Sequence, residues 1–474
     1  MNTPVTTLAE TSGHANLRVI LISAAAALGG FLFGFDTAVI NGAVDALRQA
    51  FGLSAGWTGF AVSCALLGSA AGAWYAGRLA DRFGRVRTMQ VAAVLLGAGG
   101  LGAGLAGSVA TLIVWRVVGG IGVGVASVVA PAYIAEVSPA WIRGRLGSMQ
   151  QLAIVLGIFV ALLSDAWLAG AAGGAGNMLW SGFGAWRWMF LAGVVPAMIY
   201  GGLALAVPES PRHLVARGRN ADALGVLRQV LALDDEAALH QKLSDIQNSL
   251  EREHKPAWHD LRGGSAGLLP VVWIGILLSM FQQFVGINVI FYYSATLWHS
   301  VGFTESNAFA ITVATSVVNV LVTLVAIALV DRIGRKPLLV IGSAGMAITL
   351  ALMALCFEQA AGTGASLSLP APWGPTALIA ANLYVVFFGV SWGPVVWVLL
   401  GEMFPNRIRA MALAVAAAAQ WLANFAITSS FPVMAQFSLP FSYAVYAAFA
   451  AISLVFVLKF VRETRGVELE DMPG

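Results

Sequence analysis

The sequence predicts an all-α membrane protein whose twelve transmembrane helices form two similar halves of six. Of its 474 residues, 59% are hydrophobic and only 10% are charged, whereas a soluble domain carries about 25% charged residues. Apolar runs of about 20 residues, the length that spans a bilayer, recur along the whole chain. Short motifs of the first half also return in the second half, in the same order.

The apolar runs define the expected spans. The first has no charged residue from Val19 to Phe35 and continues into DTAVING without a small-residue cleavage site. We therefore expect it to be a retained helix and not a signal peptide. The twelve runs lie at about 19–41, 56–77, 88–108, 110–134, 148–168, 186–207, 267–294, 306–330, 337–357, 374–400, 410–430 and 440–460.

One long polar stretch, at about 208–264, divides the runs six against six. We therefore expect an N-terminal bundle at 1–207, a cytoplasmic helical linker domain at 208–264, a C-terminal bundle at 265–462 and a cytoplasmic tail at 463–474.

Basic residues predict the orientation, because cytoplasmic loops of membrane proteins are enriched in Lys and Arg. With both termini cytoplasmic, all but three of the 26 Lys and Arg lie on the cytoplasmic side. The exceptions are Arg48 and Arg187 outside, and Arg116 within a span. The net charge of +3 therefore reflects topology, and we expect no nucleic-acid partner. Short loops and the lack of a glycosylation sequon in an outward loop favour a bacterial inner membrane.

Catalytic and metal-binding patterns are missing from the sequence. Cys64 and Cys356 both lie in predicted helices, and the six histidines lie in loops or tails without HExxH spacing. The sequence contains no nucleophile elbow or phosphate-binding loop. We therefore expect neither enzyme activity nor a cofactor.

The repeated motifs favour a transporter over a channel or a receptor. Two repeats joined by a cytoplasmic loop are typical of alternating-access transporters, which bind substrate near the midplane between the halves. The matching pairs are ADRFGR (80–85) with VDRIGR (330–335), EVSPAWIR (136–143) with EMFPNRIR (402–409), and VPES (207–210) with VRET (461–464).

Charges at these junctions suggest a cytoplasmic gate. Glu136 and Glu402 are each followed seven residues later by an arginine. Ion pairs that close one side in one state and part in the other would use such charges, although they also fit solvated loop charges that obey topology. The candidate gating residues are Asp81, Arg85, Glu136, Arg143, Glu209, Asp331, Arg335, Glu402 and Arg409.

Asp36 and Arg116 are expected to form an intramembrane pair. From the 1.5 Å rise of a helix, Asp36 lies about 27 Å and Arg116 about 30 Å from the cytoplasmic end. Charges at similar depth are tolerated when they are paired, and intramembrane charges commonly mark functional sites. At an offset of 252, Asp36 aligns with Asn288. One half would then handle a proton while the other binds a polar substrate; a purely structural pair is the alternative.

Polar side chains within the apolar runs predict a neutral polyol as substrate. Amides donate to and accept from hydroxyls, and aromatic rings suit the apolar faces of a sugar. No isolated amine or carboxylate stands among these amides, although each amide alone would also fit a helix–helix hydrogen bond. The candidates are Gln151, Gln282, Gln283, Asn288, Asn319 and Gln420, with Phe33, Tyr292, Tyr293, Trp397 and Trp421 beside them.

At these residues the chain resembles the sugar porter family of the major facilitator superfamily, over nearly its whole length. Within that family it is most similar to proton-coupled xylose symporters of bacteria, with the facilitative glucose transporters next. The motifs that carry the resemblance are GRLADRFGR (77–85), RVVGGIGVG (116–124), PESPR (208–212), QQFVGINVIFYYS (282–294), DRIGRK (331–336), SWGPVVWVLLGEMFP (391–405) and QWLAN (420–424).

The resemblance implies roles for individual residues. Asp36 matches the first-helix acid of proton-coupled members and Arg116 its partner. Sugar-contacting positions of the family fall on Gln151, Gln282, Gln283, Asn288, Asn319, Trp397, Gln420 and Trp421. PESPR and the segment 213–262 look like the intracellular helical domain that latches the inward gate.

Two positions depart from the family's patterns. Ile158 stands where the xylose symporters have a glutamine and glucose facilitators have isoleucine, which favours glucose. Gly389 stands where facilitators have a glutamate, an acid that the xylose symporters also lack.

The expected function is therefore proton–monosaccharide symport by a functional monomer in the lipid bilayer. Glucose is favoured, and xylose or a related aldose is possible. Two alternatives remain open. One is a facilitative uniporter in which Asp36 and Arg116 are structural. The other is a transporter-like sugar sensor, which the short cytoplasmic extensions of about 18 and 14 residues disfavour.

Overall fold

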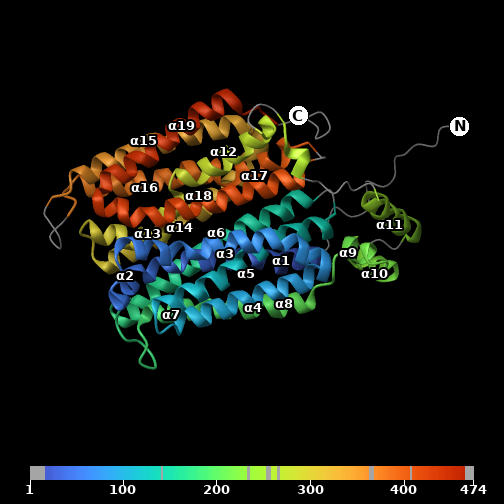
Figure 1. Cartoon of the computed structure of the whole chain (residues 1–474), viewed down its shortest axis with the longest axis horizontal. Coiled ribbons are helices and arrows are strands. Elements are labelled where there is room, and N and C mark those ends of the chain that lie inside the picture. Colours follow the sequence, from blue (N-terminus) through green and yellow to red (C-terminus); the bar gives the residue numbers. More distant parts are fainter. Residues whose placement is uncertain are drawn as a thin grey trace.

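The computed structural model describes residues 17–139, 142–231, 235–251, 258–263, 267–361, 368–405 and 408–464 (Figure 1). The predicted tail at 463–474 lies outside the described residues from 465 onward. The side chains of Arg143 and Asp331, two of the candidate gating residues, also fall outside them.

The N-terminal half has six long apolar spans, of which the first and the sixth are interrupted. The first span is α1 (Leu17–Ala38) followed by α2 (Ile40–Phe51), and the sixth is α7 (Ala185–Ala192) followed by α8 (Val194–Ala206). The others are α3 (Ala55–Phe83), α4 (Arg85–Gly104), α5 (Val109–Val137) and α6 (Arg143–Ala172).

The C-terminal half also has six spans, but its interruptions lie in the first and the fourth. Its first span is α12 (Pro270–Phe284) followed by α13 (Ile287–Ser300), and its fourth is α16 (Trp373–Val390) followed by α17 (Trp392–Met403). The others are α14 (Glu305–Ile333), α15 (Arg335–Glu358), α18 (Arg409–Phe437) and α19 (Leu439–Phe460).

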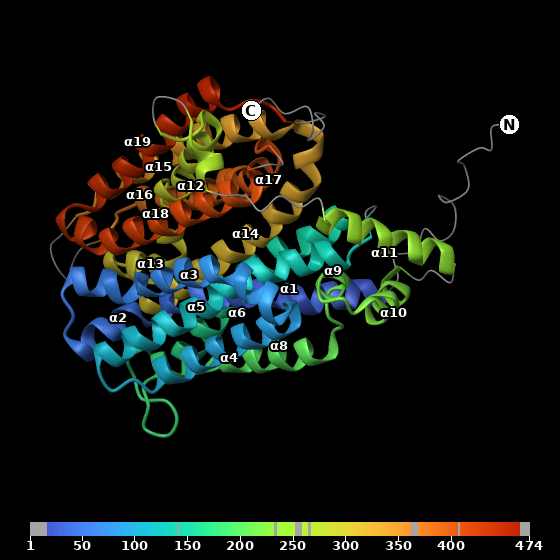
Figure 2. The same ribbon diagram turned by 45° about the vertical axis from the view of Figure 1, so that its right-hand side comes forward.

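Short helices connect the halves at one end of the bundle, which we call the linker end (Figures 1 and 2). We call the opposite end, where α2, α7 and α13 lie, the far end. The connecting helices are α9 (Pro211–Ala216), α10 (Asn220–Leu231), α11 (Glu236–Glu251) and the 3₁₀ helix η1 (Trp258–Leu261).

Hydroxyl side chains cap four of the helices that start at the far end. Ser54, Ser108, Thr304 and Ser438 each accept a hydrogen bond from a backbone N–H in the first turn of α3, α5, α14 and α19. Such caps satisfy N–H groups that the helix itself leaves unpaired. Helix starts at the membrane surface are therefore encoded locally.

The structure confirms twelve candidate spans, at the predicted places in the chain. Some predicted ends are wrong: the first span was expected to stop near 41, but its helix continues to Phe51, and the run predicted at 267–294 continues to Ser300. Polar residues such as Asp45 and Arg48 interrupt the hydropathy there. The helices continue because α2 and α13 pack against one another.

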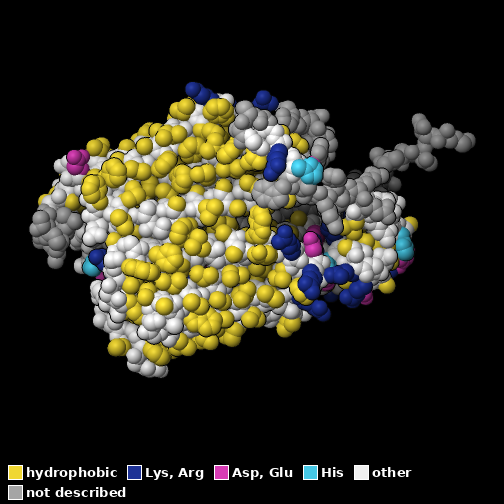
Figure 3. Space-filling view, viewed as in Figure 1, with side chains coloured by type: hydrophobic (Ala, Val, Ile, Leu, Met, Phe, Trp, Pro, Cys, Tyr) yellow, Lys and Arg dark blue, Asp and Glu magenta, His cyan; other side chains and the backbone are white. Residues whose placement is uncertain are grey.

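The outer surface of the bundle is apolar between its two ends (Figure 3). Large hydrophobic side chains such as Leu205, Val94 and Ile348 are more than two-thirds exposed there, as expected of side chains that face lipid. Lys and Arg gather at the linker end, beside α9 to α11 (Figure 3). The chain is therefore a membrane protein whose charges are concentrated beyond the apolar band.

Small residues allow the helices of each half to approach closely. A Cβ atom at Gly34 of α1 would lie 1.9 Å from the backbone oxygen of Ile154 in α6. A Cβ at Gly157 of α6 would lie 2.0 Å from the backbone oxygen of Phe31 in α1. Contacts through small residues are typical of membrane helix pairs, because lipid provides no hydrophobic force to drive helices together.

We expect Gly34→Ala to destabilise the protein by about 1–3 kcal/mol, because α1 and α6 must separate to admit the methyl group. Thermal unfolding in detergent measures the effect. Gly170→Ala, in the partner helix α6, is the control because its Cβ would meet no atom within 4 Å. Equal melting temperatures for the two variants would contradict the prediction.

Candidate functional site

Asp36 of α1 and Arg116 of α5 form an ion pair within the N-terminal half. Oδ2 of Asp36 lies 3.7 Å from Nη1 of Arg116, whose side chain is 4% exposed. The guanidinium also donates to the backbone oxygens of Asp36 at 3.3 Å and of Val62, in α3, at 3.2 Å. It lies over the ring of Phe190, 5.7 Å from the centroid. Arg116 thus connects the first, second and fourth spans.

The pair is held by charge more than by a hydrogen bond between the two side chains. Oδ2 of Asp36 is buried and has no hydrogen-bond partner among the described residues, and 3.7 Å is beyond hydrogen-bond distance. Protonation of Asp36 would remove this attraction, while Arg116 keeps its two backbone acceptors. In this state, protonation of Asp36 would therefore weaken the attraction between α1 and α5 without removing the backbone acceptors of Arg116.

The amides predicted to bind substrate form a connected network in the C-terminal half, and Gln282 is its centre. Nε2 of Gln282 donates to the backbone oxygens of Trp392 at 2.8 Å and Gly393 at 3.3 Å, beside the break between α16 and α17. Its Oε1 accepts from Nε2 of Gln420 in α18 at 2.6 Å. Gln282 therefore links α12, α17 and α18.

Gln283 and Asn288 extend the network across the break between α12 and α13. Nε2 of Gln283 donates to Oε1 of Gln282 at 3.3 Å, and Nδ2 of Asn288 donates to Oε1 of Gln283. Oε1 of Gln420 is buried without a hydrogen-bond partner among the described residues. A buried acceptor without a donor is costly, so it would favour a ligand that brings a hydroxyl.

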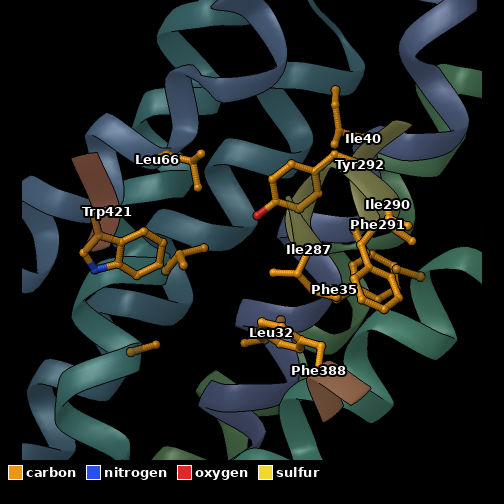
Figure 4. Close-up of a cluster of buried hydrophobic side chains, with 14 of the residues drawn as sticks. Leu32, Phe35, Ile40, Leu66, Ile287, Ile290, Phe291, Tyr292, Phe388 and Trp421 are labelled. Atoms are coloured by element: carbon orange, nitrogen blue, oxygen red, sulfur yellow. The ribbon is translucent and has the colours of Figure 1, made fainter. Parts of the chain in front are cut away.

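Aromatic side chains connect this network to the N-terminal half. The rings of Phe33 in α1 and Trp421 in α18 lie 5.5 Å apart. The Tyr292 hydroxyl is close to Thr37 of α1 and Asn424 of α18, and in Figure 4 it points toward the side on which Leu66 and Trp421 lie. The amides and the aromatic rings therefore lie where the halves meet.

The remaining candidates are more dispersed. Asn319 of α14 is 6% exposed, and a Cβ at Gly389 would lie 3.8 Å from its Oδ1. Trp397 of α17 is 45% exposed, and Gln151 of α6 is half-buried. Tyr293 is 1% exposed and donates to the backbone oxygen of Thr428 at 2.9 Å. Tyr293 therefore fastens α13 to α18, and its neighbour Tyr292 faces the junction of the halves.

Polar contacts join the two halves at the far end. Nδ2 of Asn41 in α2 donates to the backbone oxygen of Phe291 at 2.8 Å, and its Oδ1 accepts from the backbone N–H of Ala295 at 3.2 Å. Nδ1 of His299 lies 3.7 Å from Oδ2 of Asp45. These contacts therefore join α2 of the N-terminal half to α13 of the C-terminal half at the far end.

At the linker end, the charges of the N-terminal half form one cluster. Nη2 of Arg85 lies 2.9 Å from Oε1 of Glu136, and its Nη1 lies 3.4 Å from the exposed carboxylate of Asp81. Glu136 also accepts from the hydroxyl of Ser210. The Glu209 carboxylate accepts from the backbone N–H of Arg85 at 2.8 Å. PESPR is thereby attached to the junction of α3 and α4.

His213 of α9 lies beside this cluster and is 9% exposed. Burial lowers the pKa of His213, with Arg85 and Arg217 acting in the same direction and Glu209 opposing them. His213 is therefore neutral near pH 7. The charges of this cluster then come from its carboxylates and its arginines.

The C-terminal half repeats the cluster. Arg335 and Glu402 pair at 2.8 Å, Thr464 donates to Glu402 at 2.5 Å, and Glu463 accepts from the backbone N–H of Arg335 at 2.9 Å. Arg409 instead donates from Nε to the backbone oxygen of Phe404. Among the described residues, Glu402 therefore pairs with Arg335 and not with Arg409, the arginine seven residues later in the chain.

The glutamates pair within their own halves because each DRxGR turn brings its second arginine beside the glutamate's helix end. In the N-terminal half, Arg85 and Glu136 connect the α3–α4 turn to the end of α5. In the C-terminal half, Arg335 and Glu402 connect the α14–α15 turn to the end of α17. Each cluster thus fixes three helices of one half, in matching positions of the repeat.

Several buried polar residues were missed by sequence reasoning, and three of them lie in the N-terminal half. Asp165 in α6 and Asn41 in α2 are at most 1% exposed, and Gln150 is 8% exposed with Oε1 unpaired among the described residues. Asp165 is a lone acid in the apolar run FVALLSDAWLAG, so the criterion that singled out Asp36 would have found it. Nothing in the sequence singled out Asn41 as a buried polar residue, because the span predicted at 19–41 ended at this position.

Comparisons with known proteins agree with this architecture. The sequence profile described as "Sugar (and other) transporter" matches residues 22–474. A glucose transport protein of Synechocystis is 55% identical, with 97% of this chain and 98% of that protein aligned. The D-xylose–proton symporter of Escherichia coli is 38% identical, with 96% of this chain and 95% of that protein aligned.

Solved structures give the same result. XylE of Escherichia coli in a partially occluded inward-open conformation aligns with a TM-score of 0.82 at 38% identity, covering 96% of this chain and 100% of that one. XylE bound to 6-bromo-6-deoxy-D-glucose aligns with a TM-score of 0.79 at 38% identity, covering 97% and 99%. The chain therefore belongs to the sugar porters of the major facilitator superfamily and is a membrane transporter of sugars.

Proposed function

We propose that this transporter is a proton-coupled symporter of monosaccharides, with glucose as its preferred substrate. The observation that carries the proposal is the intramembrane Asp36–Arg116 pair, at 3.7 Å, beside an uncharged amide network. An acid that can be neutralised offers a proton site. The network offers donors and an unpaired acceptor to hydroxyl groups.

The preference for glucose is supported by two observations. The Synechocystis relative at 55% identity is a glucose transport protein, whereas the xylose and arabinose symporters are 38% and 36% identical. Ile158 also lacks the amide that the resemblance places there in xylose symporters. An apolar side chain at 158 offers one hydrogen bond fewer to a sugar.

We further propose that the linker end is cytoplasmic and that the structure is inward-facing. The concentration of Lys and Arg at that end supports the orientation (Figure 3). The hydrogen bonds of Asn41 join α2 to α13 at the far end, which supports an inward-facing state. Similarity to a partially occluded inward-open XylE supports the same state.

Proton movement is coupled to sugar movement if the protonation state of Asp36 biases the exchange between inward-facing and outward-facing forms. In the outward-facing form, a proton from outside neutralises Asp36 and weakens its attraction to Arg116. Sugar binding at the amide network then favours closure of the protonated form, because a ligand shifts only an equilibrium whose states it binds differently. Release of sugar and proton on the cytoplasmic side completes the cycle.

Uptake of radiolabelled glucose and xylose into proteoliposomes tests this function. We expect accumulation of glucose above its outside concentration only with an inward proton gradient, and stronger competition by glucose than by xylose. Equal, non-concentrative uptake with and without the gradient would instead identify a facilitative uniporter in which the Asp36–Arg116 pair is structural. Stronger competition by xylose would overturn the glucose assignment alone.

A further inference from the structure

A second intramembrane carboxyl, Asp165 of α6, is not used by the proposed coupling step. It is completely buried, and its Oδ2 accepts a hydrogen bond from the backbone N–H of Gly42 at 3.2 Å. Its Oδ1 has no hydrogen-bond partner among the described residues. Burial of an acid in a membrane protein is energetically unfavourable, so we expect its contact with Gly42 to serve a function.

Gly42 lies in the first turn of α2, directly after the residue that closes the far end. Asn41 makes both hydrogen bonds to α13, at Phe291 and Ala295. A Cβ at Gly42 would lie 2.7 Å from Cβ of Asp165, so α2 and α6 are as close here as a glycine permits. Asp165 therefore holds the backbone of α2 one residue away from the contact between the halves.

The N–H of Gly42 also needs an acceptor from outside its helix. The first N–H groups of a helix have no partner within it, and α2 has no side-chain cap at its first residue. In the membrane, water is not available to replace the missing acceptor. Asp165 supplies it and so fixes the rotation of α2, which directs Asn41 toward α13.

We propose that Asp165 is a positioning residue of the far-end gate, holding the first turn of α2 so that Asn41 remains engaged with α13. The inference rests on the proposed alternating access, but neither on proton coupling nor on glucose as substrate. One accepting oxygen is all that this contact uses. An asparagine at this position should therefore preserve the contact with Gly42. A leucine, which is of similar size but has no acceptor, should not.

The distance between the halves at the far end tests the proposal directly. Spin labels at Gln49 of α2 and Ser300 of α13, both exposed, report opening of this end by pulsed electron resonance without any transport. We expect Asp165→Leu to raise the open population about tenfold, the effect of losing about one hydrogen bond to a buried donor. Asp165→Asn should remain within about twofold of the wild type.

Two further variants separate this role from a general loss of stability. Ser164→Ala is the matched control on α6, because the Ser164 hydroxyl donates only to Ala161 of its own helix. If Asp165 acts through Asn41, adding Asp165→Leu to Asn41→Ala should open the far end no further than Asn41→Ala alone. Gly42→Ala, which displaces α2 from Asp165 sterically, should open the far end even if the leucine variant does not fold.

Several outcomes would overturn the proposal. An unchanged distance distribution in both Asp165→Leu and Gly42→Ala would show that the contact does not hold the gate. Additive effects of Asp165→Leu and Asn41→Ala would show that Asp165 acts elsewhere. If the asparagine and leucine variants opened the far end equally, the negative charge of Asp165, and not its hydrogen bond to Gly42, would be what holds α2. Loss of proton coupling in the uptake assay would leave all these readouts unaffected.

Discussion

Asp36→Asn is expected to abolish concentrative sugar uptake while leaving exchange of sugar across the membrane intact. The asparagine is neutral at all pH values, so it mimics the protonated acid but cannot release a proton. One proton moved through about 100 mV provides about 2.3 kcal/mol, which sustains a sugar gradient of about 50-fold. We expect the accumulation ratio to fall from that order to about 1.

Counterflow in proteoliposomes distinguishes loss of coupling from loss of transport. Exchange of labelled sugar against internal unlabelled sugar requires the halves to rock but does not require a proton gradient. Asp222→Asn is the control: it removes the carboxylate of Asp222 in α10 from an exposed pair with Arg219, and the variant should accumulate sugar as the wild type does. Accumulation by Asp36→Asn equal to the wild type would reduce the Asp36–Arg116 pair to a structural role.

Gln282→Leu is expected to weaken sugar binding by about 30- to 100-fold. The variant loses two hydrogen bonds to backbone oxygens beside the α16–α17 break and two from Gln283 and Gln420. Each lost bond contributes about 1 kcal/mol, of which repacking recovers part. The amides around it would then lose the orientation that presents donors and acceptors to a sugar.

Sugar affinity measured by quenching of tryptophan fluorescence tests this expectation, since Trp421 and Trp397 belong to the predicted site. Asn382→Leu is the matched control: this amide lies on α16 and donates only to Leu378 of its own helix, at 2.9 Å. It should bind sugar within about threefold of the wild type. Unchanged affinity in Gln282→Leu would show that the network is a helix–helix scaffold and not a sugar site.

The two halves divide their polar residues unequally, although their charges at the linker end are nearly symmetric. Arg85 with Glu136 and Arg335 with Glu402 occupy equivalent positions of the repeat. Within the spans, however, the N-terminal half holds Asp36 with Arg116, and the C-terminal half holds the amides around Gln282. A shared scaffold thus carries one ionisable site and one uncharged site, a division that the proposed coupling of a proton to a neutral sugar would use.

The sequence by itself determined the number of spans, the repeat, and two of the ionisable residues within the spans, Asp36 and Arg116. It could do so because the bilayer makes hydropathy informative over about 20 residues and makes any charge within a span conspicuous. Helix starts at the far end were equally local, since Ser54 or Ser108 caps the helix that follows it. These features depend on neighbours in the chain and on the solvent around it.

Only the tertiary structure decided which polar groups meet. Glu402 pairs with Arg335, 67 residues away, and not with Arg409, because the turn after α14 is folded against the end of α17. Likewise, Gln282 emerges as the centre of its network, and Asp165 meets Gly42 across 123 residues. Hydrogen bonds of this kind depend on distances of a few ångströms between helices, and helix packing sets those distances after hydropathy has placed each helix in the membrane.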